Sequence, residues 1–164
     1  MTTPRLAPRL VPAPLWGWSA AQLLKGARWK RIRSDAIALS GGSCAVCGDA
    51  REKGMICDEE WTYAEGIATL TSLRIVCPDC DAVTHIGSTA RRGYGDMARD
   101  HMCRVSSLSM AEADSIIDAS FAEWRTRSAE TWTVQVAPDL LARYPELATL
   151  AGHRAGPGDG RAYS

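Results

Sequence analysis

The sequence predicts a small α+β fold, and three observations support this prediction. First, two cysteine pairs bracket a segment in which one β-rich stretch precedes Ala64-Glu65-Gly66 and another follows it, as in a hairpin. Second, apolar residues recur at helical spacing before and after this segment. Third, the chain has 164 residues, of which 46% are hydrophobic, so its size suits one domain. We therefore expect a ββα unit with flanking N- and C-terminal helices.

The chain is expected to begin with an arm and two helices. Residues 1–15 hold four prolines and no apolar periodicity, which predicts a flexible, extended arm. Ser19 can cap a short helix over residues 20–25, and a second helix is predicted from about Arg28 to Leu39. The buried stripe of this second helix is expected to consist of Trp29, Ile32, Ala36 and Leu39.

Strands and helices are predicted in the central and C-terminal parts as well. Strands at 55–63 and 67–73 are followed by a short helix that ends near Thr89. The next elements are a helix at 93–104, a long helix from a capping box at Ser109 to about Arg127, an edge strand at 132–136, helical turns at 138–150 and a disordered Gly-rich tail at 153–164. The main domain is thus expected at 16–136, with a C-terminal extension at 137–164.

The net charge is zero, but the charges are unevenly distributed. Residues 1–34 hold seven basic residues and no acid, whereas the rest of the chain holds twelve bases and all 19 acids. This distribution favours a polyanion or an acidic surface as partner, unless the basic residues only form the solvated face of a helix. The sequence has no apolar run of about 18 residues and no signal-peptide pattern, so we expect a cytoplasmic protein without a membrane segment.

Four of the six cysteines form two Cys-x-x-Cys pairs, separated by 29 residues. Two such pairs can supply four thiolates to one Zn²⁺ ion in tetrahedral geometry. The alternative, a redox pair, lacks a thioredoxin-like context in this sequence. A zinc ion with four thiolates has no open coordination position, so its role is structural and its binding contributes to folding. The predicted ligands are Cys44, Cys47, Cys77 and Cys80.

Several other side chains are interpreted as structural. Trp61 and Tyr63 lie two residues apart and share one strand face, which favours core packing under the long helix over a base-stacking platform. Glu59 and Glu60 are expected to form a solvated strand edge. Cys103 is expected to be a buried thiol outside the zinc site.

Four motifs follow one another in a specific order. They are Gly-Gly-Ser-Cys-Ala-Val-Cys-Gly at 41–48, Cys-Asp-Glu-Glu-Trp-Thr-Tyr at 57–63, Cys-Pro-Asp-Cys-Asp-Ala-Val-Thr-His-Ile-Gly at 77–87, and Trp-Arg-Thr-Arg-Ser at 124–128 before Trp132. This order, over about residues 15–136, resembles the HNH endonucleases, which are His-Me finger (ββα-metal) nucleases. One HNH subgroup has Cys-His-Glu-x-Trp-x-Tyr and Cys-Pro-x-Cys-His-x-x-x-His-Ile-Gly in the corresponding places.

The resemblance implies DNA cleavage with Mg or Mn, but the catalytic positions differ from the family pattern. The general-base His is replaced by Asp58, the orienting Asn would fall at about Ser72, and Asp81 follows the last zinc cysteine. Asp58, Asp81 and His85 are therefore the candidate catalytic residues, and we expect them to converge on one pocket away from the zinc. A carboxylate binds Mg²⁺ well but is a poorer base than His near neutral pH.

The sequence thus leads to three hypotheses. The first is an HNH-like zinc protein that binds nucleic acid, expected to be DNA, with weakened or lost nuclease activity. The second is an active metal-dependent endonuclease, and the third is a zinc-stapled module that binds an acidic protein. In the first two, basic side chains would contact phosphates. The candidates are Lys25, Arg28, Lys30, Arg31, Arg33, Arg91 and Arg92.

Overall fold

The central hairpin of the protein forms as the sequence predicts. The computed structural model describes residues 3–161. Strand β1 (Ile56–Ala64) pairs antiparallel with β2 (Ile67–Val76), which extends three residues beyond its predicted end. The turn residues Glu65 and Gly66 both have positive φ values, 51° and 75°. Such a two-residue turn matches the right-handed twist of the strands that it joins.

The hairpin belongs to a four-stranded sheet with the order β1-β2-β3-β4. Strand β3 (Trp132–Val136) runs parallel to β2, and the short β4 (Arg154–Ala155) pairs with β3. The prediction of an edge strand at 132–136 is therefore wrong, and so is the prediction of disorder from residue 153. His153 stacks on Trp18 at 3.4 Å between ring centroids. Residues 162–164 of the predicted tail lie outside the described residues.

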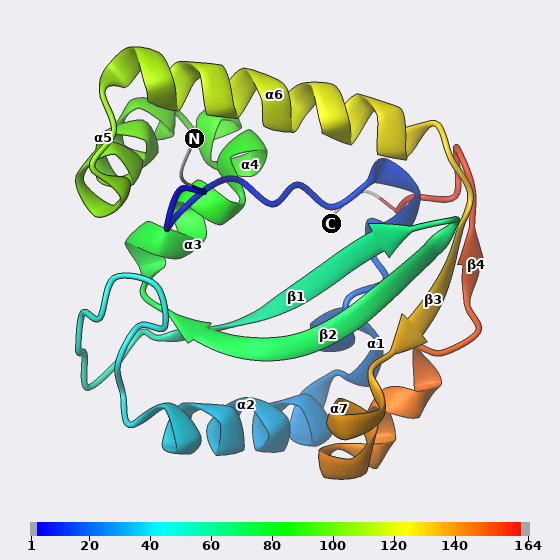
Figure 1. The fold of residues 1–164 in the computed structure, drawn as a ribbon. Coiled ribbons are helices and arrows are strands. Elements are labelled where there is room, and N and C mark those ends of the chain that lie inside the picture. The colour runs from blue at the N-terminus through cyan, green and yellow to red at the C-terminus, as the bar shows by residue number, and fades with distance from the viewer. Residues whose placement is uncertain (1–2, 162–164) are drawn as a thin grey trace.

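One face of the sheet packs against α1 (Ala20–Leu24), α2 (Gly26–Ser40), α7 (Pro138–Arg143) and the 3₁₀ turn η2 (Pro145–Thr149). In Figure 1 the helix α2 lies below the hairpin. Ile32 is fully buried in this core together with Leu70 and Leu147. Ala36 is also buried, but Leu39 of the predicted stripe is 60% exposed.

The other face carries α3 (Pro78–Thr84), α4 (Ile86–Arg91), α5 (Gly95–Ser106) and α6 (Met110–Ser128). The predicted short helix is divided at His85 into α3 and α4. Helix α6 begins with the predicted Ser109–Glu112 capping box. Helix α6 crosses above the hairpin (Figure 1), and most of its inward-facing apolar side chains are only half-buried. No helix within residues 3–161 combines the length and apolar character that a bilayer crossing requires.

The N-terminal arm is extended as predicted, but it is held in place along its length. The backbone N–H of Arg9 donates to the carbonyl of Thr84 at 2.9 Å. The N–H of Leu6 donates to Ser106 Oγ at 2.9 Å, and Leu6 is buried. The arm ends in the 3₁₀ turn η1 (Ala13–Leu15). The expectation of a flexible arm is thus wrong for the described residues 3–15, and residues 1–2 lie outside them.

Candidate metal centres and the adjoining cleft

The four predicted zinc ligands form one cluster at the junction of the hairpin and α3. Their sulfur atoms all lie within 4.8 Å of one another, and Cys47 Sγ is 3.7 Å from Cys77 Sγ. A tetrahedron with Zn–S bonds of about 2.3 Å has sulfur–sulfur edges of about 3.8 Å. Cys77 caps the N-terminus of α3, which begins with Pro78. These four cysteines can therefore hold a zinc ion.

The electrostatics of the cysteine cluster are those of thiols that a cation would stabilise as thiolates. Burial raises the pKa of Cys44, but backbone N–H groups, chiefly that of Cys47, outweigh it and lower the pKa to about 7. Burial raises the pKa of Cys80 instead. His101 Nε2 lies 3.2 Å from Cys80 Sγ, so it contacts a cluster residue from α5. Cys103 points elsewhere and is half-buried, less buried than predicted.

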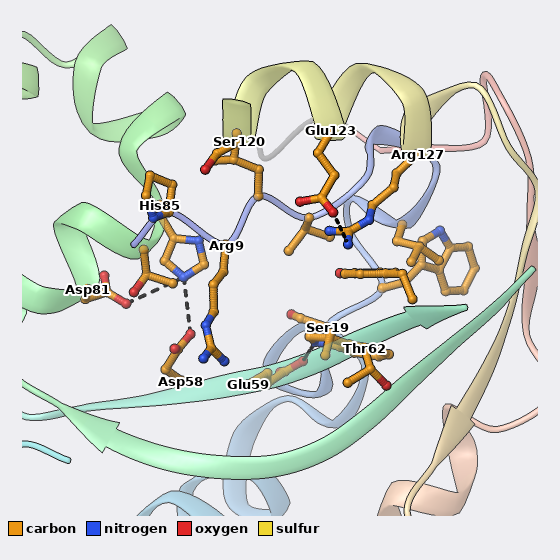
Figure 2. A pocket seen from close by; sticks show the side chains of 18 of the residues that line it. Arg9, Ser19, Asp58, Glu59, Thr62, Asp81, His85, Ser120, Glu123 and Arg127 are labelled. Atoms are coloured by element: carbon orange, nitrogen blue, oxygen red, sulfur yellow. Dashed lines mark hydrogen bonds and ion pairs between the residues drawn. The ribbon is translucent and has the colours of Figure 1, made fainter. Parts of the chain in front are cut away.

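Asp58, Asp81 and His85 form a second cluster that shares no residue with the first. Asp58 lies on β1, Asp81 lies on α3, and His85 follows the last residue of α3. His85 Nε2 is 3.3 Å from Asp58 Oδ1 and 3.6 Å from Asp81 Oδ1 (Figure 2). One ligand atom from each of the three residues lies within 4.8 Å of the others. The predicted convergence of these side chains is confirmed by their distances.

Asp58 is 5% exposed and has a second partner, Arg74, that the sequence did not identify. Arg74 Nε and Nη2 each lie 2.9 Å from Asp58 Oδ2. A β-bulge beside Glu60 shifts the strand register by one residue, which places Arg74 directly opposite Asp58. Ser72, expected at the orienting position, instead pairs with Glu60 and contacts its carboxylate. Ser72 therefore does not orient Asp58 in this structure.

Burial and charged neighbours shift the pKa of all three members of the second cluster. Burial opposes ionisation of Asp58, but its bonds with His85 and Arg74 lower the pKa below its ordinary value. Burial raises the pKa of Asp81. Burial disfavours the imidazolium of His85, yet its hydrogen bond with Asp58 and the charge of Asp81 raise the pKa overall. At neutral pH the cluster therefore holds an ionised Asp58 beside an imidazole that binds a proton more readily than usual.

The second cluster lies at one end of a cleft of about 600 Å³. The arm, β1, the end of α3 and α6 form its walls (Figure 2). Arg9 of the arm pairs with Glu60 at 2.6 Å, and Arg127 of α6 pairs with Glu123 at 2.6 Å. The Arg127 guanidinium also lies 4.7 Å from the ring centroid of Tyr63. Other residues that line the cleft include Leu10, Val11, Leu15, Trp61, Thr62 and Ser120.

None of the seven predicted nucleic-acid-binding residues lines this cleft. The five from Lys25 to Arg33 belong to α2 or the residue before it, on the opposite face of the sheet (Figure 1). Arg33 donates to the Met55 carbonyl at 2.9 Å, and Arg31 pairs with Glu146. Arg91 and Arg92 lie at the end of α4. The cation in direct contact with the second cluster is instead Arg74, which no sequence pattern singled out, and the charge of Arg92 acts on Asp81 from outside the cleft.

Glu59 is half-buried, and its carboxylate is hydrogen-bonded within the protein and is not part of a solvated strand edge. Its Oε1 accepts a hydrogen bond of 2.8 Å from the N–H of Ala20, at the start of α1. Its Oε2 accepts one of 3.2 Å from Trp61 Nε1. Burial raises the pKa of Glu59 to about 7, although these hydrogen bonds lower it in part. The carboxyl group therefore joins β1 to α1 at a cost in desolvation.

Replacing Glu59 with Gln is expected to remove part of the pH dependence of stability. Because the pKa of folded Glu59 is about 7 against an ordinary 4.5, the free energy of unfolding falls as pH rises from about 4.5 to about 7. This group alone accounts for a loss of up to about 3 kcal/mol. Urea unfolding of both proteins at about pH 5 and about pH 8 measures the difference. An equal loss of stability in wild type and Glu59→Gln would contradict this assignment.

Comparisons of the chain with family models, with curated proteins and with solved structures give no match.

Proposed function

We propose that this chain is a divergent HNH-type protein that binds DNA and hydrolyses its phosphodiester bonds weakly. In this proposal the four clustered cysteines hold a structural zinc ion. Asp58, Asp81 and His85 hold a divalent cation, Mg²⁺ or Mn²⁺. The observation that carries the proposal is the convergence of these three side chains at one end of a cleft.

The donor set fits a catalytic cation of this kind. Two carboxylates and one imidazole suit Mn²⁺ better than Mg²⁺, which prefers oxygen ligands alone. A divalent cation at such a site polarises a phosphoryl oxygen and lowers the pKa of bound water. The guanidinium of Arg9, 2.6 Å from Glu60, is positioned to pair with a phosphate oxygen that enters the cleft.

The activity is expected to be weak because Asp58 is already satisfied in the folded protein. Its two oxygens face Arg74 and His85, so a cation must compete with the buried Arg74 charge. An aspartate with a lowered pKa is also a weak general base near neutral pH.

The ion pair between Asp58 and Arg74 favours a second candidate function, DNA binding without cleavage. The exposed Arg28 and Lys30 on α2 would support contact with DNA or with an acidic protein.

Plasmid nicking tests the cleavage proposal. We expect slow nicking that requires added Mn²⁺ or Mg²⁺, and we expect Asp81→Asn to lower its rate by about a hundredfold through loss of a cation ligand. Asp118→Asn removes an exposed carboxylate on α6 and serves as the matched control, which should retain the wild-type rate. Nicking that is independent of metal, or that persists unchanged in Asp81→Asn, would rule out this site as its source.

A further inference from the structure

The second cluster is recessed beneath other parts of the chain. Asp58 is 5% exposed and lies on the floor of the cleft, with the arm and α6 along the cleft's other walls (Figure 2). Proteins read intact duplex DNA with an element that projects into a groove, the wider of which spans about 12 Å. The β1 segment that carries Asp58 does not project, since residues 8–11 of the arm and Ser120 of α6 also line the space around it.

The cover over β1 is fixed by contacts between distant parts of the chain. The indole N–H groups of Trp16 and Trp124 both donate to the Val11 carbonyl, at 2.9 and 3.0 Å. The rings of these two tryptophans stack with centroids 6.0 Å apart. The N–H of Ala13 donates to Ser128 Oγ at 3.0 Å. The arm and α6 therefore form one rigid cover, and opening the cleft to a duplex would break all of these contacts.

The two ends of the cleft have the chemistry of the two ends of a nucleotide. The end at Asp58 holds the candidate cation ligands and Arg9, which suit a phosphodiester. The end at Thr62 is lined by apolar and aromatic side chains and by the planar guanidinium of Arg127, which suit a base. Asp58 and Thr62 are about 13 Å apart along the strand. The volume of about 600 Å³ is typical of a pocket for one small ligand.

The acidic side chains that line the cleft do not oppose an anionic ligand. Glu123 pairs with Arg127, so its charge is already balanced, and Glu60, which does not itself line the cleft, pairs with Arg9. Glu59 is bonded to the start of α1 and to Trp61. Only the candidate cation ligands leave negative charge at one end of the cleft, where a divalent cation would reverse its sign.

We propose that the cleft binds a single unpaired nucleotide of a DNA strand, with its phosphodiester at Asp58, Asp81 and His85 and its base against Tyr63, Trp61 and Arg127. This proposal rests on the proposed function and narrows its substrate to single-stranded or locally unpaired DNA. Intact duplex is bound poorly, since a base must leave its stack before it can enter the cleft.

The test compares an unstructured, dye-labelled oligodeoxynucleotide with the duplex made by annealing it to its complement. Binding is measured by fluorescence anisotropy with Ca²⁺, which carboxylates also bind, in place of the catalytic cation. Cleavage is measured with Mg²⁺ and with Mn²⁺. We expect a preference of about tenfold to hundredfold for the single strand, which reflects the cost of unpairing a base.

Two variants on α6 form a matched pair for this test. Ser120→Phe places a ring inside the cleft, whereas Ala119→Phe places the same ring on the exposed side of the helix. We expect Ser120→Phe to lose the single-strand preference and Ala119→Phe to keep it. Arg127→Ala, which removes the stacking surface without filling the cleft, should weaken single-strand binding about tenfold. Far-UV circular dichroism and zinc content establish that each variant is folded.

The outcomes separate this inference from the cleavage proposal. Single-strand preference that Ser120→Phe abolishes supports the inference, even if neither DNA is cleaved. Cleavage of duplex and single strand at equal rates would overturn the inference and leave the cleavage proposal standing. Equal binding of both DNAs, or single-strand preference that persists in a folded Ser120→Phe variant, would likewise overturn the inference.

Discussion

The Cys80→Ser variant is expected to lose most of its folded structure, as is wild-type protein treated with a strong zinc chelator. Structural Zn²⁺ in zinc-finger peptides contributes about 10–16 kcal/mol of apparent binding free energy, which is comparable with the usual 5–15 kcal/mol of domain stability. Cys80 is fully buried, in the same apolar cluster as Val83 and Met102. Without the ion, burial would keep Cys80 as a neutral thiol at the junction of the hairpin and α3.

Metal analysis and far-UV circular dichroism measure this effect directly. We expect one zinc per chain in the wild type, and a cooperative thermal transition that disappears on chelation. Cys103→Ser is the matched control, because Cys103 lies outside the cluster and its sulfur is hydrogen-bonded to Ser109 and Met110 instead. Unchanged helicity in metal-free protein would show that the four cysteines do not hold the fold together.

Local sequence patterns predicted the elements that local interactions determine. The Ser109–Glu112 capping box starts α6 because both hydrogen bonds form within the first turn of the helix. The turn at Glu65-Gly66 sets the hairpin because its positive φ values are local. The spacing of the cysteine pairs was informative for a different reason: a single ion would require one geometry of all four side chains, and their sulfur atoms lie together as that geometry needs.

The partner of Asp58 could not be predicted because it depends on a bulge. Counting back from the two-residue turn without a bulge would place Leu73 opposite Asp58. The register shift beside Glu60 places Arg74 there instead, and the hydroxyl of Thr71 donates to the Glu60 carbonyl at that point. A one-residue shift exchanges the faces that the side chains occupy. The sequence therefore identified the carboxylate of Asp58 but not Arg74, the charged side chain that pairs with it.

Contacts between distant residues explain the other differences from the sequence predictions. The arm was predicted to be flexible from its prolines and its missing periodicity. Both are local signals, which carry no information about contacts with distant residues. Its order depends on bonds to residues about a hundred positions away, such as Leu6 to Ser106. The tail is ordered in the same way, because Arg154 and Ala155 pair with β3. The cleft exists only through such contacts, so its residues form no continuous motif.

Asp58→Ala is expected to reduce both stability and activity, for different reasons. Removing one partner of a buried ion pair costs about 3–5 kcal/mol. We expect a loss toward the lower end of this range, because the mostly buried Arg74 loses its main partner but keeps Glu60 at 3.4 Å. Loss of a cation ligand should abolish cleavage as well. The double variant Asp58→Ala/Arg74→Met removes both charges and is expected to recover much of the stability but none of the activity. Urea unfolding and nicking assays on the three proteins measure the two effects separately.

The pH dependence of the Asp58→Ala effect provides an independent check. The pKa of folded Asp58 is lowered, so its contribution to stability is present above about pH 4 and is lost as pH falls through the folded pKa. The pKa of folded His85 is raised, so the contribution of its bond to Asp58 is present below about pH 6.5 and is lost as pH rises through the folded pKa. The destabilisation by Asp58→Ala should therefore be greatest between about pH 4 and about pH 6.5. If the double variant is as unstable as Asp58→Ala across this range, the uncompensated charge of Arg74 is not the cause.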